Sequence, residues 1–189
     1  MIISISGLSG SGKSTVAKML AEELEFERIY IGGILRQIAA DRGITILELM
    51  KRAETDSTID EDADKYVIDL GKQKDNFVIE SRTAFHFIPD SLKIFIKVRE
   101  SEAAERIWKD IATKNEARKD EETAKNPEEL VAKIKERNEI DRERYRKYYG
   151  IDYLDENNYD LVIDSTNIPA KEVLERILQE VNKLDKENS

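Results

Sequence analysis

The sequence predicts an α/β fold of three layers, in which helices cover both faces of a parallel sheet of five strands. Short apolar runs alternate with longer segments whose apolar residues recur every three or four positions, as in strands followed by helices. The runs at 76–80 and 92–98 contain few polar residues, which is typical of strands buried on both faces. The run at 2–6 leads through a glycine-rich turn into an amphipathic segment, so a first strand feeds a first helix.

Local signals justify the elements in chain order. We expect strands at 2–6, 28–31, 76–80, 92–98 and 159–164, and helices at 13–24, 32–43, about 45–54, 60–73, 101–112, 127–149 and 168–184. Gly43 and Gly150 are suited to end the helices that precede them, because glycine readily adopts the left-handed conformation. Asn126 followed by Pro127 is a start signal for the long helix. The stretch 113–126 before it is highly charged and poor in apolar residues.

Composition limits the classes of protein. A chain of 189 residues, 40% of them hydrophobic, predicts a single domain over 1–189. It has no cysteine, which excludes disulfides and thiolate metal sites, and no run of eighteen apolar residues that would span a membrane. The net charge of −9 disfavours nucleic acid as a partner. We expect a cytoplasmic monomer with no membrane or nucleic-acid partner, so any bound anion must meet a local basic cluster.

The stretch "GLSGSGKST" fits the P-loop pattern G-x-x-x-x-G-K-[ST] between a strand and a helix. Its glycines allow main-chain N–H groups to face phosphate oxygens, and the start of the helix adds unpaired N–H groups and a positive dipole end. Lys13 would bridge the β- and γ-phosphates of ATP, and the Ser14 hydroxyl would ligate Mg²⁺. The predicted nucleotide-binding residues are Gly7, Leu8, Ser9, Gly10, Ser11, Gly12, Lys13, Ser14 and Thr15. The alternative is a glycine-rich turn that binds nothing.

A P-loop alone leaves the reaction open, because GTPases, motor ATPases and small-molecule kinases share it. The strand at 92–98 is followed by "RESEAAERI" rather than the N-K-x-D that a GTPase needs. Motor and transporter ATPases are usually larger and end a strongly apolar strand on Asp or Asp-Glu, to which only "NFVIE" is comparable. A small kinase is favoured, since its second substrate is usually a small anion that requires several arginines.

Arginines occur where such a site needs them. Arg36 lies one turn into the helix after the second strand, and Arg82 follows the third strand, whose carboxyl end points to the ligand crevice. Arg137, Asp141 and Arg144 are spaced to share one helix face. The guanidinium fork suits terminal phosphates and developing phosphoryl charge. Spacing alone also permits a solvated lattice of ion pairs.

The chain resembles cytidylate kinases of the short archaeal type, within the P-loop nucleoside monophosphate kinase family. The similarity runs through "ISISGLSGSGKSTVAKMLAEEL", "GGILRQIAADRGI", "VIESRTAFHFIPDSLKIFIKV", "RNEIDRERYRKYYGID" and "YDLVIDSTNIPAKEVLERIL". The first stretch is shared by many kinases. The arrangement R-x-x-x-D-x-x-R, followed by "RY" and "YGID", is much more particular and favours a functional role for that helix face.

The resemblance implies an ATP- and Mg²⁺-dependent transfer of the γ-phosphoryl group to CMP or dCMP. It implies a nucleoside monophosphate (NMP)-binding insert at about 32–74 and a lid region at about 110–145 whose closure excludes water. The positions of Arg36 and Arg82 would contact the acceptor phosphate. Arg137 would reach the transferred phosphoryl group, and Asp141 and Arg144 would bind the phosphate end of the acceptor. With Lys13, these last three form the expected catalytic set.

Several points stay open at the level of sequence. Departures from the family pattern at Ile31, Ser81, Thr83 and Phe85-His86 lie near the acceptor base or ribose, and no residue is identified as reading the base. Another acceptor, such as UMP, AMP or a non-nucleotide anion, and a non-catalytic NTP-binding module are the alternatives. Glu80 could orient Mg²⁺-bound water or hydrogen-bond the P-loop. His86 is interpreted as a packed or capping residue rather than a catalytic one.

Overall fold

The computed structural model describes residues 1–113 and 124–187. Strands and helices alternate through most of the chain, and a 3-10 turn at Glu156–Asn158 precedes the last strand. The strands are β1 Ile2–Gly7, β2 Glu27–Tyr30, β3 Phe77–Glu80, β4 Leu92–Lys97 and β5 Leu161–Asp164. The helices are α1 Lys13–Leu24, α2 Ile31–Asp41, α3 Ile46–Ala53, α4 Thr58–Gln73, α5 Ala84–Phe87, α6 Glu100–Ala112, α7 Pro127–Tyr149 and α8 Ala170–Glu187.

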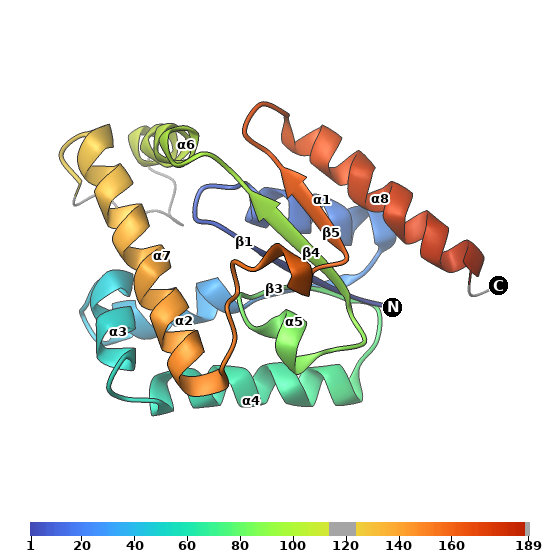
Figure 1. Cartoon of the computed structure of the whole chain (residues 1–189), viewed down its shortest axis with the longest axis horizontal. Coiled ribbons are helices and arrows are strands. Elements are labelled where there is room, and N and C mark those ends of the chain that lie inside the picture. The colour runs from blue at the N-terminus through green and yellow to red at the C-terminus, as the bar shows by residue number, and fades with distance from the viewer. Residues whose placement is uncertain (114–123, 188–189) are drawn as a thin grey trace.

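The five strands form one parallel sheet in the order β2-β3-β1-β4-β5. This confirms the predicted sheet, and β1 lies at its centre with β3 and β4 on either side (Figure 1). Ile5 of β1 pairs with Glu80 at the end of β3, and Gly7 pairs with Ile96 of β4. The carboxyl ends of the central strands therefore meet at one edge, where ligands bind in open parallel sheets.

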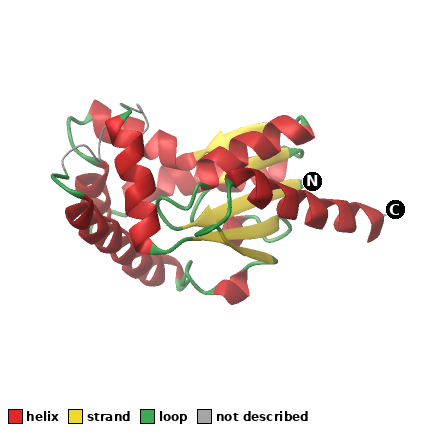
Figure 2. Ribbon diagram, turned by 90° about the horizontal axis from the view of Figure 1, so that it is seen from above, coloured by secondary structure: helices red, strands yellow, loops and turns green. Residues whose placement is uncertain are grey.

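Helices pack on both faces of the sheet, which gives the predicted three layers (Figure 2). One face carries Ile3, Ile5 and Ile94, which pack against α1 and α8. The opposite face carries Phe77 and Ile79, which pack against α4 and α5. Side chains along a strand alternate between faces, and both faces here are apolar, so the strands show little polar interruption.

Helix α7 crosses from α6 to α3 outside these layers (Figure 1). Its first half packs on α6 through Leu130 and Ile134. At its other end the Tyr148 hydroxyl donates to the carbonyl of Ala53 at 2.9 Å, and Lys147 Nζ donates to the carbonyl of Glu54 at 2.6 Å. The predicted lid helix and the predicted NMP-binding insert are thus in direct contact.

Some boundaries differ from the predicted ones. Ile31 opens α2 rather than ending the second strand, and its side chain is buried there against the sheet. The short helix α5 was not predicted, because four residues are too few to show helical periodicity. Most of the charged stretch 113–126, namely 114–123, lies outside the described residues. Within the described residues, no helix has the length and apolar character needed to cross a membrane.

The start of α7 follows the predicted capping pattern. The Asn126 side chain accepts a hydrogen bond of 2.7 Å from the Glu129 backbone N–H, and Pro127 occupies the first turn. We expect Asn126→Ala to lower the free energy of unfolding by about 1 kcal/mol, because one N–H at the helix start loses its acceptor. Urea denaturation measures this loss.

Asn182→Ala is the matched control, since Asn182 is an exposed residue inside α8. It should change the free energy of unfolding by less than about 0.5 kcal/mol. Equal effects of the two substitutions would contradict the capping role of Asn126.

Candidate functional site

The loop between β1 and α1 needs glycine at two positions, because of their backbone conformation and their close neighbours. Gly7 has φ +148°, and a Cβ there would come within 2.2 Å of the Ile96 carbonyl oxygen. Gly10 has φ +77°, and a Cβ would come within 2.8 Å of Ala103. A larger residue at either position forces the loop to move. The loop is also tied across the sheet, because Ser165 Oγ donates to the Ser11 carbonyl at 2.9 Å.

A cleft of about 530 Å³ opens beside this loop. It is lined by loop and α1 residues from Gly10 to Val16, by Arg28 and Tyr30 of β2, and by Arg106 of α6 with the segment after β5. Arg106 Nη2 donates to the Ser165 carbonyl at 2.7 Å, which fixes the far wall of the cleft. The cleft therefore combines a helix N-terminus with three basic side chains, Lys13, Arg28 and Arg106, an arrangement suited to a phosphorylated ligand.

A second, smaller cavity of about 80 Å³ adjoins the first. Four residues line both hollows, namely Gly10, Lys13, Ser14 and Tyr30. The second cavity also brings together Arg36 and Arg82, predicted to contact the acceptor phosphate, and Arg137, predicted to reach the transferred phosphoryl group. Acidic side chains of Asp60, Asp64 and Glu80 line it as well. Lys13 and Ser14 thus lie where the two hollows meet.

A chain of buried ion pairs lies against the second cavity. Arg82 Nη1 lies 2.8 Å from Asp141 Oδ2, and Arg144 Nη2 lies 2.9 Å from Asp141 Oδ1. Arg144 Nε in turn lies 2.8 Å from Asp60 Oδ2 of α4. Asp141 and Arg144 are 0% and 1% exposed, so the solvated lattice that spacing alone permitted is wrong for these two residues.

The charges of the neighbouring arginines and burial decide the protonation of Asp141 and Asp60 in these ion pairs. Burial alone raises the pKa of Asp141, but the guanidinium charges of Arg82, Arg144 and Arg137 outweigh it and bring the pKa below its ordinary value. Burial raises the pKa of Asp60 to about 6, with Arg144 opposing the rise. Asp141 is therefore the firmly ionised member of the pair of aspartates.

The predicted residues occupy distinct positions in this arrangement. Arg82 Nη2 donates to Ser9 Oγ of the P-loop at 3.2 Å, so Arg82 faces the loop as expected. Arg36 Nη1 donates to the Tyr30 hydroxyl at 2.6 Å. Asp141 and Arg144 lie behind Arg82, outside the residues that line the cavity.

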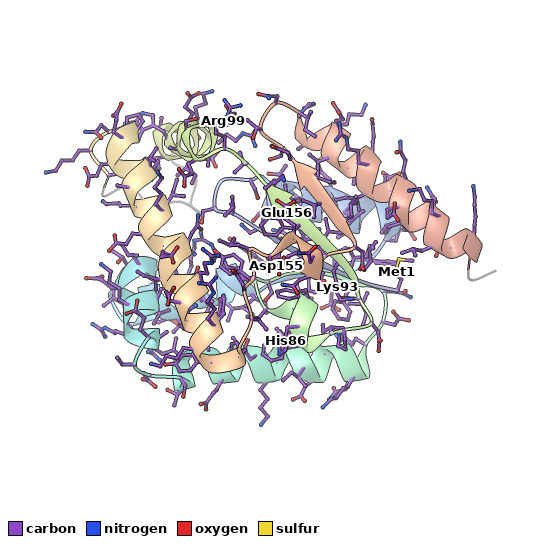
Figure 3. All side chains as sticks on the ribbon, viewed as in Figure 1. Met1, His86, Lys93, Arg99, Asp155 and Glu156 are labelled. Atoms are coloured by element: carbon purple, nitrogen blue, oxygen red, sulfur yellow. The ribbon has the colours of Figure 1, made fainter. Side chains whose placement is uncertain are left out.

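Glu80 and His86 take roles that the sequence left unresolved. Glu80 is 2% exposed and pairs with Arg28 of β2, whose Nε donates to Glu80 Oε1 at 2.7 Å. This partner replaces the hydrogen bond to the P-loop that was one of the two interpretations. His86 is exposed on α5, its ring 5.1 Å from that of Phe87 and 6.5 Å from that of Tyr149 (Figure 3). The His86 side chain thus contacts neighbouring aromatic rings while remaining exposed, and its interpretation as a packed or capping residue rather than a catalytic one stays a prediction.

Sequence reasoning missed several residues of the two hollows, namely Arg28, Tyr30, Asp60, Asp64 and Arg106. Asp60 and Asp64 belong to an acidic run in α4, where a solvated helix face was the natural interpretation. Their spacing of four residues places them on one face, which is the only local signal that could have found them.

The sequence profile of the cytidylate kinase-like family matches residues 2–167. The chain belongs to this family. The cytidylate kinase of Natronomonas pharaonis is 40% identical over 170 residues, which cover 89% of this chain and 82% of that protein. These matches confirm the family and the class of enzyme predicted from the sequence.

A second relative is a much longer protein. The S-adenosylmethionine-dependent nucleotide dehydratase of Lacinutrix mariniflava is 34% identical over 182 residues, which cover 96% of this chain but 36% of that protein. Among solved structures, the shikimate kinase of Bacteroides thetaiotaomicron superposes with a TM-score of 0.63 at 15% identity and covers 96% of this chain and 98% of that one. This likeness confirms the P-loop kinase fold.

The buried ion pairs predict a strong effect of Asp141→Asn. Removing this charge leaves Arg82 and Arg144 buried without their common counter-ion, which should lower the free energy of unfolding by roughly 3 kcal/mol at neutral pH. Urea denaturation measures the loss. Glu143→Gln, an exposed change on the same helix, should cost less than about 0.5 kcal/mol.

The contribution of Asp141 to the free energy of unfolding should decrease at low pH. Because the folded state lowers the pKa of Asp141, its contribution is present above the ordinary pKa of about 3.9 and is lost as pH falls through the folded value. The difference in stability between the wild type and Asp141→Asn should therefore narrow as the pH falls below about 4. A difference that is constant with pH would count against an ionised Asp141.

Proposed function

We propose that the protein is a nucleoside monophosphate kinase that transfers the γ-phosphoryl group of ATP to CMP or dCMP, giving CDP or dCDP. The observation that carries this proposal is the pair of hollows that meet at Lys13 and Ser14, the larger lined by the P-loop and the smaller by arginines. Family membership supports the same reaction, since many of the curated relatives are cytidylate kinases.

In this proposal the donor phosphates lie along the P-loop and the acceptor phosphate lies among Arg36, Arg82 and Arg137. Lys13 stands where the two meet and would hold the transferring group in line with the acceptor oxygen. The arginines would stabilise the charge on the phosphoryl oxygens during transfer. Asp141 and Arg144, which lie behind Arg82, would fix the direction of its guanidinium.

The residues present fit a Mg²⁺ ion bound with ATP. The Ser14 hydroxyl lines both hollows, and Glu80 Oε2 is buried with no hydrogen-bond partner among the described residues. A hydroxyl and a carboxylate oxygen are the hard ligands that Mg²⁺ accepts, directly or through its waters. When bound, the ion would neutralise charge on the β- and γ-phosphates. Ser14 would be the direct ligand and Glu80 the partner of a bound water.

The geometry does not favour the two alternative functions. A non-catalytic NTP-binding module needs no second anion site, yet the second cavity gathers three arginines beside the P-loop. A non-nucleotide acceptor is also disfavoured, because α3 and α4 contribute Met50, Ala63 and Asp64 to the cavity beyond the arginines. Such a mixed lining is suited to a ligand with a base or sugar as well as a phosphate.

An acceptor screen tests the proposal. Purified protein with ATP and Mg²⁺ is assayed for ADP release with CMP, dCMP, UMP, AMP and shikimate, and we expect CMP and dCMP to give the highest kcat/KM. Arg137→Ala should lower kcat with CMP by roughly 10²- to 10³-fold while leaving ATP affinity nearly unchanged, because its charge is needed during transfer.

Arg146→Ala is the control for that variant, since Arg146 is an exposed arginine on the same helix. It should keep wild-type kcat. Turnover by the wild type that no monophosphate stimulates would overturn the proposed function.

A further inference from the structure

We propose that Asp64 of α4 selects the acceptor base, by accepting a hydrogen bond from the exocyclic amine of a cytosine-like pyrimidine. The inference rests on the proposed function and adds the residue and the chemical group that would separate CMP from UMP. Asp64 lines the same cavity as Arg36, Arg82 and Arg137, but it comes from α4 of the insert rather than from the P-loop or α7. A ligand whose phosphate meets the arginines can therefore present its base toward α4.

The hydrogen bonds around Asp64 all run toward its carboxylate. The Thr83 hydroxyl donates to Asp64 Oδ1 at 3.2 Å, and the Tyr149 hydroxyl donates to Asp64 Oδ2. Ser81 Oγ accepts from the Thr83 backbone N–H at 3.1 Å and lies 3.1 Å from Thr83 Oγ1. Because the Thr83 hydroxyl donates its proton to Asp64, the Ser81 hydroxyl can donate to Thr83 Oγ1. The hydrogen bonds then run in one direction, from Ser81 to Thr83 to Asp64.

Because both hydroxyls donate to it, the Asp64 carboxylate can only accept further hydrogen bonds. An ionised carboxylate has about four acceptor sites and no donor, and the two hydroxyls occupy two of them. The sites that remain can only accept. The amine of cytosine donates there, whereas the carbonyl oxygen of uracil at the same ring position would face the carboxylate with no proton between them.

The other acid in the cavity is less suited to this role. Asp60 already lies 2.8 Å from Arg144, so its charge is committed to a buried ion pair. Asp64 is partly exposed, and its hydrogen bonds come from neutral hydroxyls. Burial raises the pKa of Asp64 above its ordinary value, and hydrogen bonds from Tyr149 and Thr83 and the charge of Arg144 limit that rise.

The test compares kcat/KM for CMP and UMP in the wild type and in Asp64→Asn. The amide of Asn can turn its NH₂ toward a carbonyl, so we expect the preference for CMP over UMP to fall at least about tenfold, through loss with CMP and gain with UMP. The KM for ATP should not change. Asp69→Asn makes the same chemical change on α4 outside the cavity lining and should leave the preference at its wild-type value.

A second measurement uses only the wild type, in case the variant does not fold. A CMP analogue with hydrogen in place of the 4-amino group should have kcat/KM at least about tenfold below that of CMP, since the carboxylate then has no donor to accept from. An unchanged preference in a folded Asp64→Asn, or equal use of CMP and the analogue, overturns the inference while CMP kinase activity persists. If the wild type phosphorylates no nucleoside monophosphate, the proposed function fails instead.

Discussion

Buried ion pairs between three separate elements hold the candidate site together. Asp141 of α7 lies between Arg82, which follows β3, and Arg144, which continues to Asp60 of α4. Burying four charged groups is costly, and the cost is repaid only when each charge keeps its partner. Because the partners come from the segment after β3, from α7 and from α4, these ion pairs favour one relative placement of all three. The shape of the smaller cavity therefore depends on them.

The lining of the smaller cavity carries slightly more basic than acidic side chains. Its basic side chains are Lys13, Arg36, Arg82 and Arg137, and its acidic ones are Asp60, Asp64 and Glu80, of which burial raises the pKa of Asp60 to about 6. A chain with net charge −9 thus concentrates positive charge where an acceptor phosphate would lie. An anion bound there would complete the balance of charge that the aspartates begin.

The parts of the structure that were predictable are those with local causes. The P-loop was identified because its glycines, Lys13 and Ser14 form a complete pattern within nine consecutive residues. The five strands were predictable because both faces of the sheet are apolar. The start of α7 at Pro127 was predictable from its cap. Each of these features leaves its signal in adjacent residues.

The parts that could not be predicted depend on contacts across the fold. Asp60 and Asp64 look like a solvated acidic face until Arg144, Tyr149 and Thr83 are placed beside them. The role of Arg28 depends on its hydrogen bond to Glu80, which is 52 residues away in the chain. Tyr30 is informative only because its hydroxyl accepts from Arg36. No pattern of spacing within one helix or strand encodes these partners.

The two hollows of the candidate site are lined by different sets of elements. The larger cleft is lined by the P-loop, the start of α1, β2, α6 and the segment after β5, whereas the smaller cavity adds residues from α2, α3, α4, α7 and the segment after β3. Among the side chains that the structure describes, those of α4 line the smaller cavity and not the larger cleft, so substitutions in α4 away from Asp60 should act on the smaller cavity. Changes at Asp141 act on both, since it holds Arg82, which in turn donates to Ser9 of the loop. Lys13 and Ser14 line both hollows, so a change at either residue should also affect the two sides of the site together.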